Sequence, residues 1–312
     1  NLGIRLKFKI IKLKPTTIKQ VVKLLEHYDL ASIDDDLNGR LFETFLSATI
    51  RGKELGQFFT PRNVVKFMTN LANIQVDFQR KIIDNVIDGS CGTGGFLIEI
   101  MADMTNKIKN NNSLSDLEKE RLIQQGRNDK LYGIDASRII SRIARINMYL
   151  HGYGGSRIYN LDFLDKSIKI EDDSDKELKN ELLEYKEYII NNNLKFDVVL
   201  TNPPFSMRYE RGKEKDEHED EKAILEKYYL AYDPKTKKML SSLQSNVMFL
   251  ERYHELLKPH GKLIIILDES LLTTPSNRIF RKFITDNFII RAVISLPENT
   301  FVRADTGVKT SI

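Results

Sequence analysis

Six short runs rich in β-branched residues recur between residues 82 and 296, and longer stretches with helical spacing separate most of them. The runs are IIDNVID (82–88), LYGID (131–135), RIYNLDF (157–163), FDVVL (196–200), KLIIIL (262–267) and IIRAVISL (289–296). Strands that alternate with helices are typical of a parallel sheet covered by helices on both faces. The sequence therefore predicts an α/β fold, with a crossover helix expected at 137–152.

The segments outside this alternation are helical or polar. From Lys19 to Ile50 apolar residues fall three and four apart, which predicts two helices interrupted near 31–36. We expect two polar stretches, 106–130 and 165–195, to form surface excursions between sheet elements. The charge-dense stretch that follows, residues 208–224, predicts a solvated, mobile loop, or a lid over a neighbouring site.

Composition excludes several classes of protein. A net charge of +4 is compatible with a nucleic-acid partner but is too small to indicate one. The single cysteine rules out a disulfide within the chain and fits the cytoplasm, and the five histidines lack zinc-ligand spacing. No apolar run approaches the ~20 residues of a membrane span. Because the first residue is not Met, we expect a fragment of a longer protein.

A glycine-rich segment, DGSCGTGGF (88–96), follows the first run and precedes the helical stretch FLIEIMADM (96–104). Glycines let the backbone pass close to a ligand, and the helix N-terminus offers free N–H groups. The segment therefore predicts a nucleotide-binding edge rather than a plain strand-to-helix turn. Its spacing matches neither G-x-G-x-x-G nor a P-loop, which argues against a dinucleotide or a triphosphate. We expect Cys91 to be structural, since no activating base is visible nearby.

An acidic residue closes each of three successive predicted strands: Asp88, Asp135 and Asp162. Ligands of open α/β sheets bind beyond the carboxyl ends of the strands, where an acid can accept hydrogen bonds from a ribose diol. Asp135 could instead cap the helix that starts near Ser137, and the two roles are compatible. We therefore predict that these acids border a ligand site.

The run at 196–200 is followed directly by TNPPFS (201–206). Prolines stiffen a turn and restrict the residue before them, so nearby carbonyl groups keep fixed directions. Asn202 and the backbone carbonyl of Pro203 then offer two acceptors, and Phe205 offers a flat face for stacking. A turn that merely ends a strand is the alternative. The glycine loop upstream favours the ligand pocket.

Five segments in this order resemble the amino-methylating DNA methyltransferases, above all the modification subunit of type I restriction-modification systems and its fused relatives. They are GQFFTP (56–61), DGSCGTGGF (88–96), YGID (132–135), NLDF (160–163) and TNPPF (201–205). The resemblance covers roughly 36–312 and implies a Rossmann-like S-adenosylmethionine-dependent sheet with an N-terminal helical segment. It implies a helical segment over 1–53 and a methyltransferase domain over 54–312, whose C-terminal end we expect to be cut short. The family usually has proline at the position of Gly89, and we expect this departure to relax the turn without abolishing cofactor binding.

By resemblance, one set of residues holds the target base and a second set holds S-adenosylmethionine. The catalytic set is Asn202, Pro203, Pro204 and Phe205. The cofactor set is Phe59, Thr60, Pro61, Asp88, Gly92, Thr93, Gly94, Gly95, Phe96, Asp135, Asp162 and Phe163. Phe163 fits a core position equally well, so its role is left open. No metal is expected.

The chemistry explains why such a site needs no cysteine or serine nucleophile. The exocyclic amine of adenine is a poor nucleophile because its lone pair is delocalised into the ring. Two fixed acceptors draw the nitrogen toward sp³ geometry and aim its lone pair at the methyl group. The base must leave the duplex to reach them, so base flipping is implied.

The resemblance therefore predicts a site-specific DNA adenine N6-methyltransferase of the cytoplasm. The expected partners are double-stranded DNA, a specificity subunit and a restriction subunit, or their fused equivalents, and no membrane. RNA or protein-glutamine N-methylation and a non-catalytic cofactor-binding scaffold are the alternatives. We see no helix-turn-helix or zinc finger, so we expect a separate subunit or a region beyond residue 312 to read the target sequence.

Overall fold

The computed structural model covers most of the α/β region. It describes residues 14–27, 60–153, 157–168, 170, 175–205, 207–212, 219–303, 306–307 and 309–312. Helix α1 (Pro15–Leu25), which begins with proline at its first position, is the first of the two helices predicted near the N-terminus. The second falls within residues 28–59, outside the described residues, as does the domain boundary predicted after residue 53.

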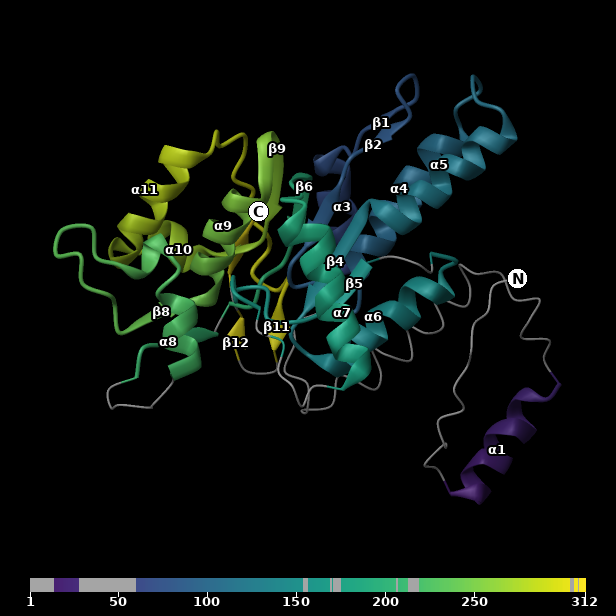
Figure 1. Cartoon of the computed structure of the whole chain (residues 1–312), viewed down its shortest axis with the longest axis horizontal. Coiled ribbons are helices and arrows are strands. Elements are labelled where there is room, and N and C mark those ends of the chain that lie inside the picture. The colour runs from purple at the N-terminus through teal and green to yellow at the C-terminus, as the bar shows by residue number, and fades with distance from the viewer. Residues whose placement is uncertain are drawn as a thin grey trace.

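Five parallel strands form the central sheet (Figure 1). In spatial order they are β5 (Arg157–Asn160), β4 (Leu131–Asp135), β3 (Val86–Asp88), β6 (Phe196–Thr201) and β9 (Leu257–Ile265). Each neighbouring pair is parallel, which confirms the sheet expected from the alternating runs. The predicted strand LYGID coincides with β4.

Beyond β9 the chain adds short antiparallel pairings. β10 (Leu267–Asp268) pairs with β13 (Thr310–Ser311), and Ile312 exchanges two backbone hydrogen bonds with Ile294. The strand predicted at 289–296 is therefore only partly correct. Its pairing is confined to residues 294–296, while Ile289 remains 83% exposed.

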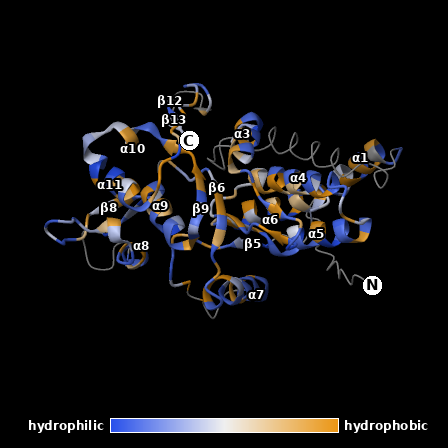
Figure 2. Ribbon diagram, turned by 90° about the horizontal axis from the view of Figure 1, so that it is seen from above, coloured by the Kyte–Doolittle hydropathy of each residue, from blue (hydrophilic) through white to orange (hydrophobic). Residues whose placement is uncertain are grey.

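Helices cover both faces of the sheet, as predicted. The larger ones are α3 (Arg62–Ala72), α4 (Gly95–Lys109), α5 (Asp116–Asp129), α6 (Arg138–Leu150), α7 (Lys176–Tyr185), α9 (Ser245–Leu256) and α11 (Arg278–Asn287). Residues of β6 enter two separate apolar clusters: Phe196 and Val199 join α7, α9 and α11, whereas Val198 and Leu200 join α3, α4, α5 and α6. Figure 2 shows apolar residues concentrated along β6 and β9, between these layers.

Shorter elements connect these layers. They are β1 (Val76–Asp77), β2 (Ile82–Ile83), η1 (Lys186–Asn191), β7 (Arg208–Glu210), α8 (Glu219–Leu225), η2 (Tyr229–Ala231), β8 (Ser242–Gln244), α10 (Glu269–Thr273), η3 (Pro275–Asn277), β11 (Val302–Arg303) and β12 (Thr306–Gly307). The predicted run 82–88 is split, because β2 pairs with β1 in a separate hairpin and only β3 enters the sheet. The loop predicted at 208–224 is wrong at both ends, which form β7 and α8, and residues 213–218 lie outside the described part.

The two expected surface excursions lie at the surface as predicted, and each contains a helix that packs against the rest of the fold. Within 106–130, α5 begins at a capping box in which Ser115 and Glu118 satisfy each other's backbone N–H groups. Within 165–195, α7 and η1 bury Leu182, Tyr185 and Ile189 against the sheet. Sparse apolar residues among many charges were enough to anchor both segments.

Gly133 in β4 and Gly126 in α5 give opposite predictions for substitution by alanine. A Cβ at Gly133 would stand 2.7 Å from Leu97 Cδ1 and 3.1 Å from Cys91 Sγ, and overpacking of this kind costs about 1–3 kcal/mol. A Cβ at Gly126 would meet Met101 Cε at 3.4 Å, and alanine favours the helix by about 0.5–1 kcal/mol. Urea denaturation should show Gly133→Ala destabilised and Gly126→Ala neutral or stabilised. Equal losses would contradict this packing.

Candidate functional site

The carboxyl ends of β3, β4 and β6 lie side by side and form the candidate site. From β3 the chain order runs one way through β4 and β5 and the other way through β6 and β9. The reversal between β3 and β6 is a topological switch point, where open α/β sheets bind their ligands. Asp88, Asp135 and Thr201 end the three strands, and Asn202 follows directly. The structure thus brings the glycine loop and the Asn-Pro-Pro-Phe turn to one edge.

The glycine loop turns sharply between β3 and α4. Gly92 and Gly94 have φ values of +54° and +86°, a region that favours glycine, and Gly94 is the N-cap of α4. A Cβ built at Gly92 or Gly95 would meet no atom within 4 Å, so the space beside these residues is open. The Thr93 carbonyl accepts a hydrogen bond from Asn147 Nδ2 at 2.9 Å. The loop is therefore fixed by a hydrogen bond at Thr93, while the space beside Gly92 and Gly95 is open.

Gly89 does not relax the turn, contrary to our expectation. A Cβ at this position would stand 2.6 Å from the Phe163 ring and 2.7 Å from Tyr253 Oη. In addition, Gly89 N–H donates a hydrogen bond to Tyr253 Oη at 2.9 Å, which proline could not do because it lacks an N–H group. Gly89 is thus closely packed and hydrogen-bonded.

Asp88 is an almost fully buried acid at the end of β3, with 1% of its surface exposed. Burial raises the pKa of this carboxyl from 3.8 to about 7, although hydrogen bonds from the Thr201 hydroxyl (2.8 Å) and Ser90 N–H (3.1 Å) oppose the shift. Asp88 is therefore poised between its neutral and charged forms near neutral pH.

Asp135 connects the ends of β3 and β4. Its carboxylate accepts hydrogen bonds from Gly92 N–H (3.2 Å) and Ser137 N–H (2.8 Å). The N-cap of α6 is Ser137, whose hydroxyl accepts from Ile140 N–H, so the capping role considered for Asp135 itself is wrong. Asp135 instead orients the glycine loop and the turn before α6.

Asp162 lies two residues beyond β5, next to Phe163. One carboxylate oxygen accepts from Leu164 N–H at 2.9 Å and the other from the Tyr209 hydroxyl at 2.6 Å, while burial raises the pKa of Asp162. Phe163 is 2% exposed and stacks on Phe249, with ring centroids 5.6 Å apart. Of the two roles left open for Phe163, the structure shows the core contact. Phe96 is likewise buried, in the first turn of α4.

A hydrogen bond between Thr60 and Asn202 joins the segment GQFFTP to the Asn-Pro-Pro-Phe turn. Asn202 Nδ2 donates to Thr60 Oγ1 at 3.0 Å across 142 positions of sequence. Asn202 Oδ1, by contrast, is buried without a hydrogen-bond partner in the described structure. Pro61 is the N-cap of α3, and the predicted neighbour Phe59 lies outside the described residues. The bond to Thr60 thus fixes which end of the Asn202 amide is left to accept.

The rest of the Asn-Pro-Pro-Phe turn packs against α9 and the C-terminal segment. Pro203 is buried, and the Pro204 carbonyl accepts from Ser245 Oγ at 3.1 Å. Phe205, expected to offer a flat face for stacking, is 7% exposed and makes an edge-to-face contact with Phe301, with ring centroids 5.8 Å apart. This contact arises because an apolar ring beside water packs against a neighbouring apolar ring.

Cys91 has a structural position. The side chain is 6% exposed, and its backbone N–H donates to the Ile134 carbonyl at 2.9 Å. Burial raises the pKa of the thiol, so the thiolate needed for nucleophilic attack is disfavoured. Among the described residues, no group of three His, Cys, Asp or Glu side chains is placed to hold a metal ion.

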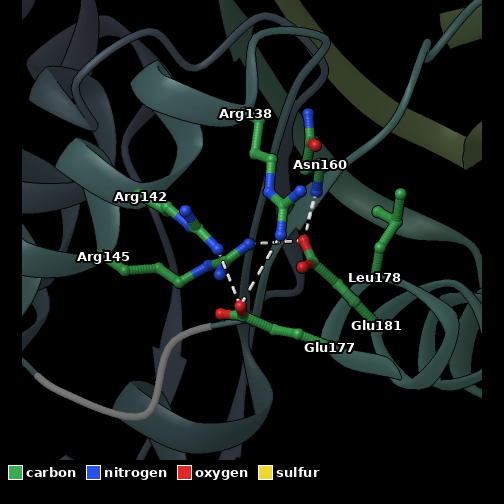
Figure 3. A pocket seen from close by; sticks show the side chains of 7 residues that line it. All are labelled: Arg138, Arg142, Arg145, Asn160, Glu177, Leu178 and Glu181. Atoms are coloured by element: carbon green, nitrogen blue, oxygen red, sulfur yellow. Dashed lines mark hydrogen bonds and ion pairs between the residues drawn. The ribbon is translucent and has the colours of Figure 1, made fainter. Parts of the chain in front are cut away.

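An ion-pair cluster lies between α6 and α7 (Figure 3). It surrounds a cavity of about 10 Å³ lined by Arg138, Arg142, Arg145, Asn160, Glu177, Leu178 and Glu181. Glu181 accepts from both Arg145 and Asn160 N–H. The Asn160 amide in turn donates to the carbonyls of Asp135 (3.0 Å) and Ala136 (2.9 Å). The cavity is too small for a nucleotide, and the cluster holds a turn in place.

Four polar residues of the edge were not predicted: Ser90, Thr201, Ser245 and Tyr253. Ser90 and Thr201 lie inside the quoted motifs, and their places between a strand end and a ligand loop could have marked them. Tyr253 sits in the third turn of α9, and nothing in its local sequence distinguishes it from a core tyrosine. Only the fold reveals its contact with Gly89.

The strand order, the glycine loop at the end of β3 and the Asn-Pro-Pro-Phe turn at the end of β6 define a Rossmann-like methyltransferase fold. The family model described as N-6 DNA Methylase matches residues 33–312. The chain therefore belongs to the N-6 DNA methylase family.

Two curated relatives have similar sequences. The EcoEI methylase subunit of a type I restriction enzyme from Escherichia coli is 25% identical over 299 residues, covering 95% of this chain and 50% of that protein. The MpnII methylase subunit of a type I restriction enzyme from Mycoplasma pneumoniae is 25% identical over 317 residues, covering 100% of this chain and 49% of that protein. The chain thus spans about half the length of these relatives.

Solved structures agree on the fold. A type I restriction-modification methyltransferase subunit from Streptococcus thermophilus superposes with a TM-score of 0.62 at 22% identity, covering 95% of this chain and 52% of that one. At this level of identity the likeness concerns the fold alone. None of the helices within the described ranges is both long and apolar enough to cross a membrane.

The pKa of Asp88 predicts a specific pH dependence of stability. Between pH 3.8 and about pH 7 the unfolded carboxyl is ionised and the folded one is protonated, so stability present at low pH is lost as pH rises through this window. Asp88→Asn keeps the shape of the side chain and cannot ionise. The variant should gain stability relative to wild type as pH rises from 4 to about 7, measured by urea denaturation. Parallel stability curves would show that Asp88 ionises normally.

Proposed function

We propose that this chain transfers a methyl group from S-adenosylmethionine to the N6 amine of a flipped-out adenine in double-stranded DNA. It would do so as the methyltransferase part of a restriction-modification system. Membership of the N-6 DNA methylase family supports the reaction class. Both relatives described above are called methylase subunits of type I restriction enzymes.

The observation that carries the proposal is the state of the Asn202 side chain. A buried carbonyl oxygen without a partner is costly, and buried polar atoms are nearly always hydrogen-bonded. Asn202 Oδ1 is such an atom, while Nδ2 is committed to Thr60. An acceptor held ready in this way suits an N–H donor from outside the chain, such as an exocyclic amine.

The surrounding turn supplies the remaining contacts of the proposed base site. The Pro203 backbone carbonyl is the second acceptor for the amine, and the adjoining prolines keep it in a fixed direction. Phe205 would stack on the base, which requires Phe301 to yield part of its contact. Holding the amine between two acceptors positions its lone pair and stabilises the positive charge that develops on nitrogen.

The residues at the edge fit S-adenosylmethionine. The open space beside Gly92 and Gly95 gives room for the cofactor. Asp135 provides a carboxylate for its ribose diol, and Asp88 provides a carboxylate for its cationic group. In this proposal Thr93 and Gly94 complete the cofactor loop. Thr60 and Pro61 lie on the opposite side of the cofactor, and Asp162 lies toward its adenine end. Phe59 and Phe96 are proposed as apolar neighbours of the cofactor. S-adenosylmethionine, when bound, supplies an electrophilic methyl group on its sulfonium.

Partners follow from the same proposal. A specificity subunit or a fused equivalent would read the target sequence, and a restriction subunit or its equivalent would complete the system. A cytoplasmic location fits such an assembly. The division into a helical segment over 1–53 and a methyltransferase domain over 54–312 remains part of the proposal.

Asn202→Ala tests the proposal by separating transfer from cofactor binding. The variant loses the acceptor for the amine, so we expect transfer of labelled methyl groups to DNA to fall at least ~100-fold, the usual effect of removing one such polar contact. Binding of S-adenosylmethionine, measured by calorimetry, should stay within about threefold because Asn202 does not hold it. The assay uses the chain with its native partner subunits. Full transfer by Asn202→Ala would refute the role of this side chain.

Thr60 gives a second, matched test. Thr60→Val removes the acceptor for Asn202 Nδ2 and leaves the amide free to turn, so transfer should fall about 10- to 100-fold. Thr60→Ser keeps the hydroxyl and should retain most of the wild-type rate. Equal rates for the two variants would mean that the bond to Thr60 does not orient Asn202.

A further inference from the structure

Three hydroxyl groups lie between the glycine loop and the Asn-Pro-Pro-Phe turn. They belong to Ser90, Thr201 and Tyr253, and the last two residues have no exposed surface. Thr201 Oγ1 lies 3.1 Å from Ser90 Oγ and 3.0 Å from Tyr253 Oη. Each hydroxyl therefore contacts another, across more than fifty positions of sequence.

Two of these hydroxyls close a ring with the end of β3. Gly89 N–H donates to Tyr253 Oη at 2.9 Å, and Thr201 Oγ1 donates to Asp88 Oδ1 at 2.8 Å. Burial raises the pKa of Tyr253, so its hydroxyl keeps the proton and can donate to Thr201. The ring then runs from Gly89 through Tyr253 and Thr201 to Asp88, the residue before Gly89. Hydrogen bonds in such a chain strengthen one another.

A branch of this ring reaches the catalytic turn. Ser90 Oγ donates to the Asn202 backbone carbonyl at 3.3 Å, or to Thr201 Oγ1. Thr201 is joined to Asn202 by a peptide bond. The group that would accept the substrate amine is thus connected to the glycine loop by two short routes.

Packing alone does not explain a tyrosine at position 253. Its ring lies among Phe163 and Phe249, with centroids 5.1 and 5.8 Å away, where phenylalanine would fit as well. Burying a hydroxyl is unfavourable unless it is hydrogen-bonded. Here the hydroxyl satisfies the N–H of Gly89, and a proline at position 89 would have no N–H to satisfy.

We propose that Tyr253 is a positioning residue for methyl transfer, which with Thr201 and Ser90 holds the cofactor loop and Asn202 in one fixed relation. This inference rests on the proposed function. Tyr253 touches neither substrate nor cofactor in this scheme. It acts by fixing the two backbones between which the methyl group passes, and a shift of ~1 Å in such a relation can cost ~100-fold in rate.

The test is Tyr253→Phe in the chain assembled with its native partner subunits. We expect the single-turnover rate of methyl transfer to fall at least ~10-fold, with the Kd of S-adenosylmethionine changed less than about threefold. Tyr132→Phe is the matched control. Tyr132 belongs to the same apolar cluster, is 4% exposed and donates to the Asp129 carbonyl (3.2 Å) away from the site, so its loss should leave the rate unchanged.

Thr201 provides the second arm. Thr201→Val should slow methyl transfer at least as much as Tyr253→Phe. Thr201→Ser keeps the hydroxyl and should retain most of the rate. The double variant Tyr253→Phe/Thr201→Val should be no slower than Thr201→Val alone. Such non-additivity marks residues that act as one unit. A purely structural role predicts instead that rate losses follow the folded fraction and multiply in the double variant.

The outcomes separate the two proposals. If wild type transfers methyl groups and Tyr253→Phe does so equally fast, Tyr253 is not a positioning residue, and the proposed function stands. If a folded wild type with its partner subunits transfers no methyl group to DNA, the proposed function fails, and the role of Tyr253 fails with it.

Discussion

The hydrogen bond from the Thr201 hydroxyl to Asp88, 2.8 Å long and fully buried, joins the two strands on which the rest of the site depends. β3 and β6 are neighbours in space but more than a hundred positions apart in sequence. Their carboxyl ends carry the glycine loop and the Asn-Pro-Pro-Phe turn. Because the chain order reverses here, both loops leave the sheet with room between them, and a ligand can enter.

The electrostatics of the edge follow from this buried contact. Burial away from water favours the neutral form of a carboxyl group, whereas a cation placed beside it favours the charged form. Asp88 lies near the balance point, with its pKa raised to about 7. The proposed cofactor is a cation at its sulfur, so binding would draw Asp88 toward its charged form. Gly89 contributes to the same arrangement by donating to Tyr253, a bond that proline could not make.

The sequence was sufficient to predict the positions of those candidate-site residues that lie at the ends of parallel strands. LYGID and FDVVL predicted β4 and β6, and parallel strands then necessarily brought Asp135 and Asn202 to one edge. It failed for contacts made by distant side chains. The spacing that made α9 a helix could not show that Tyr253 would meet the glycine loop, nor that Phe301 would cover Phe205. The sparse apolar residues of α7, set among many charges, also gave no sign that Leu182 and Tyr185 would be buried.

The central claim is that the Asn202 carbonyl is held ready for the N6 amine of adenine. The most direct measurement is nucleoside analysis of substrates treated with labelled S-adenosylmethionine and this chain assembled with its native partner subunits. DNA, RNA and protein are offered in parallel. The account predicts label in N6-methyladenine of double-stranded DNA. Label in N4-methylcytosine, in RNA or in glutamine would contradict it, as would cofactor binding with no transfer to any of them.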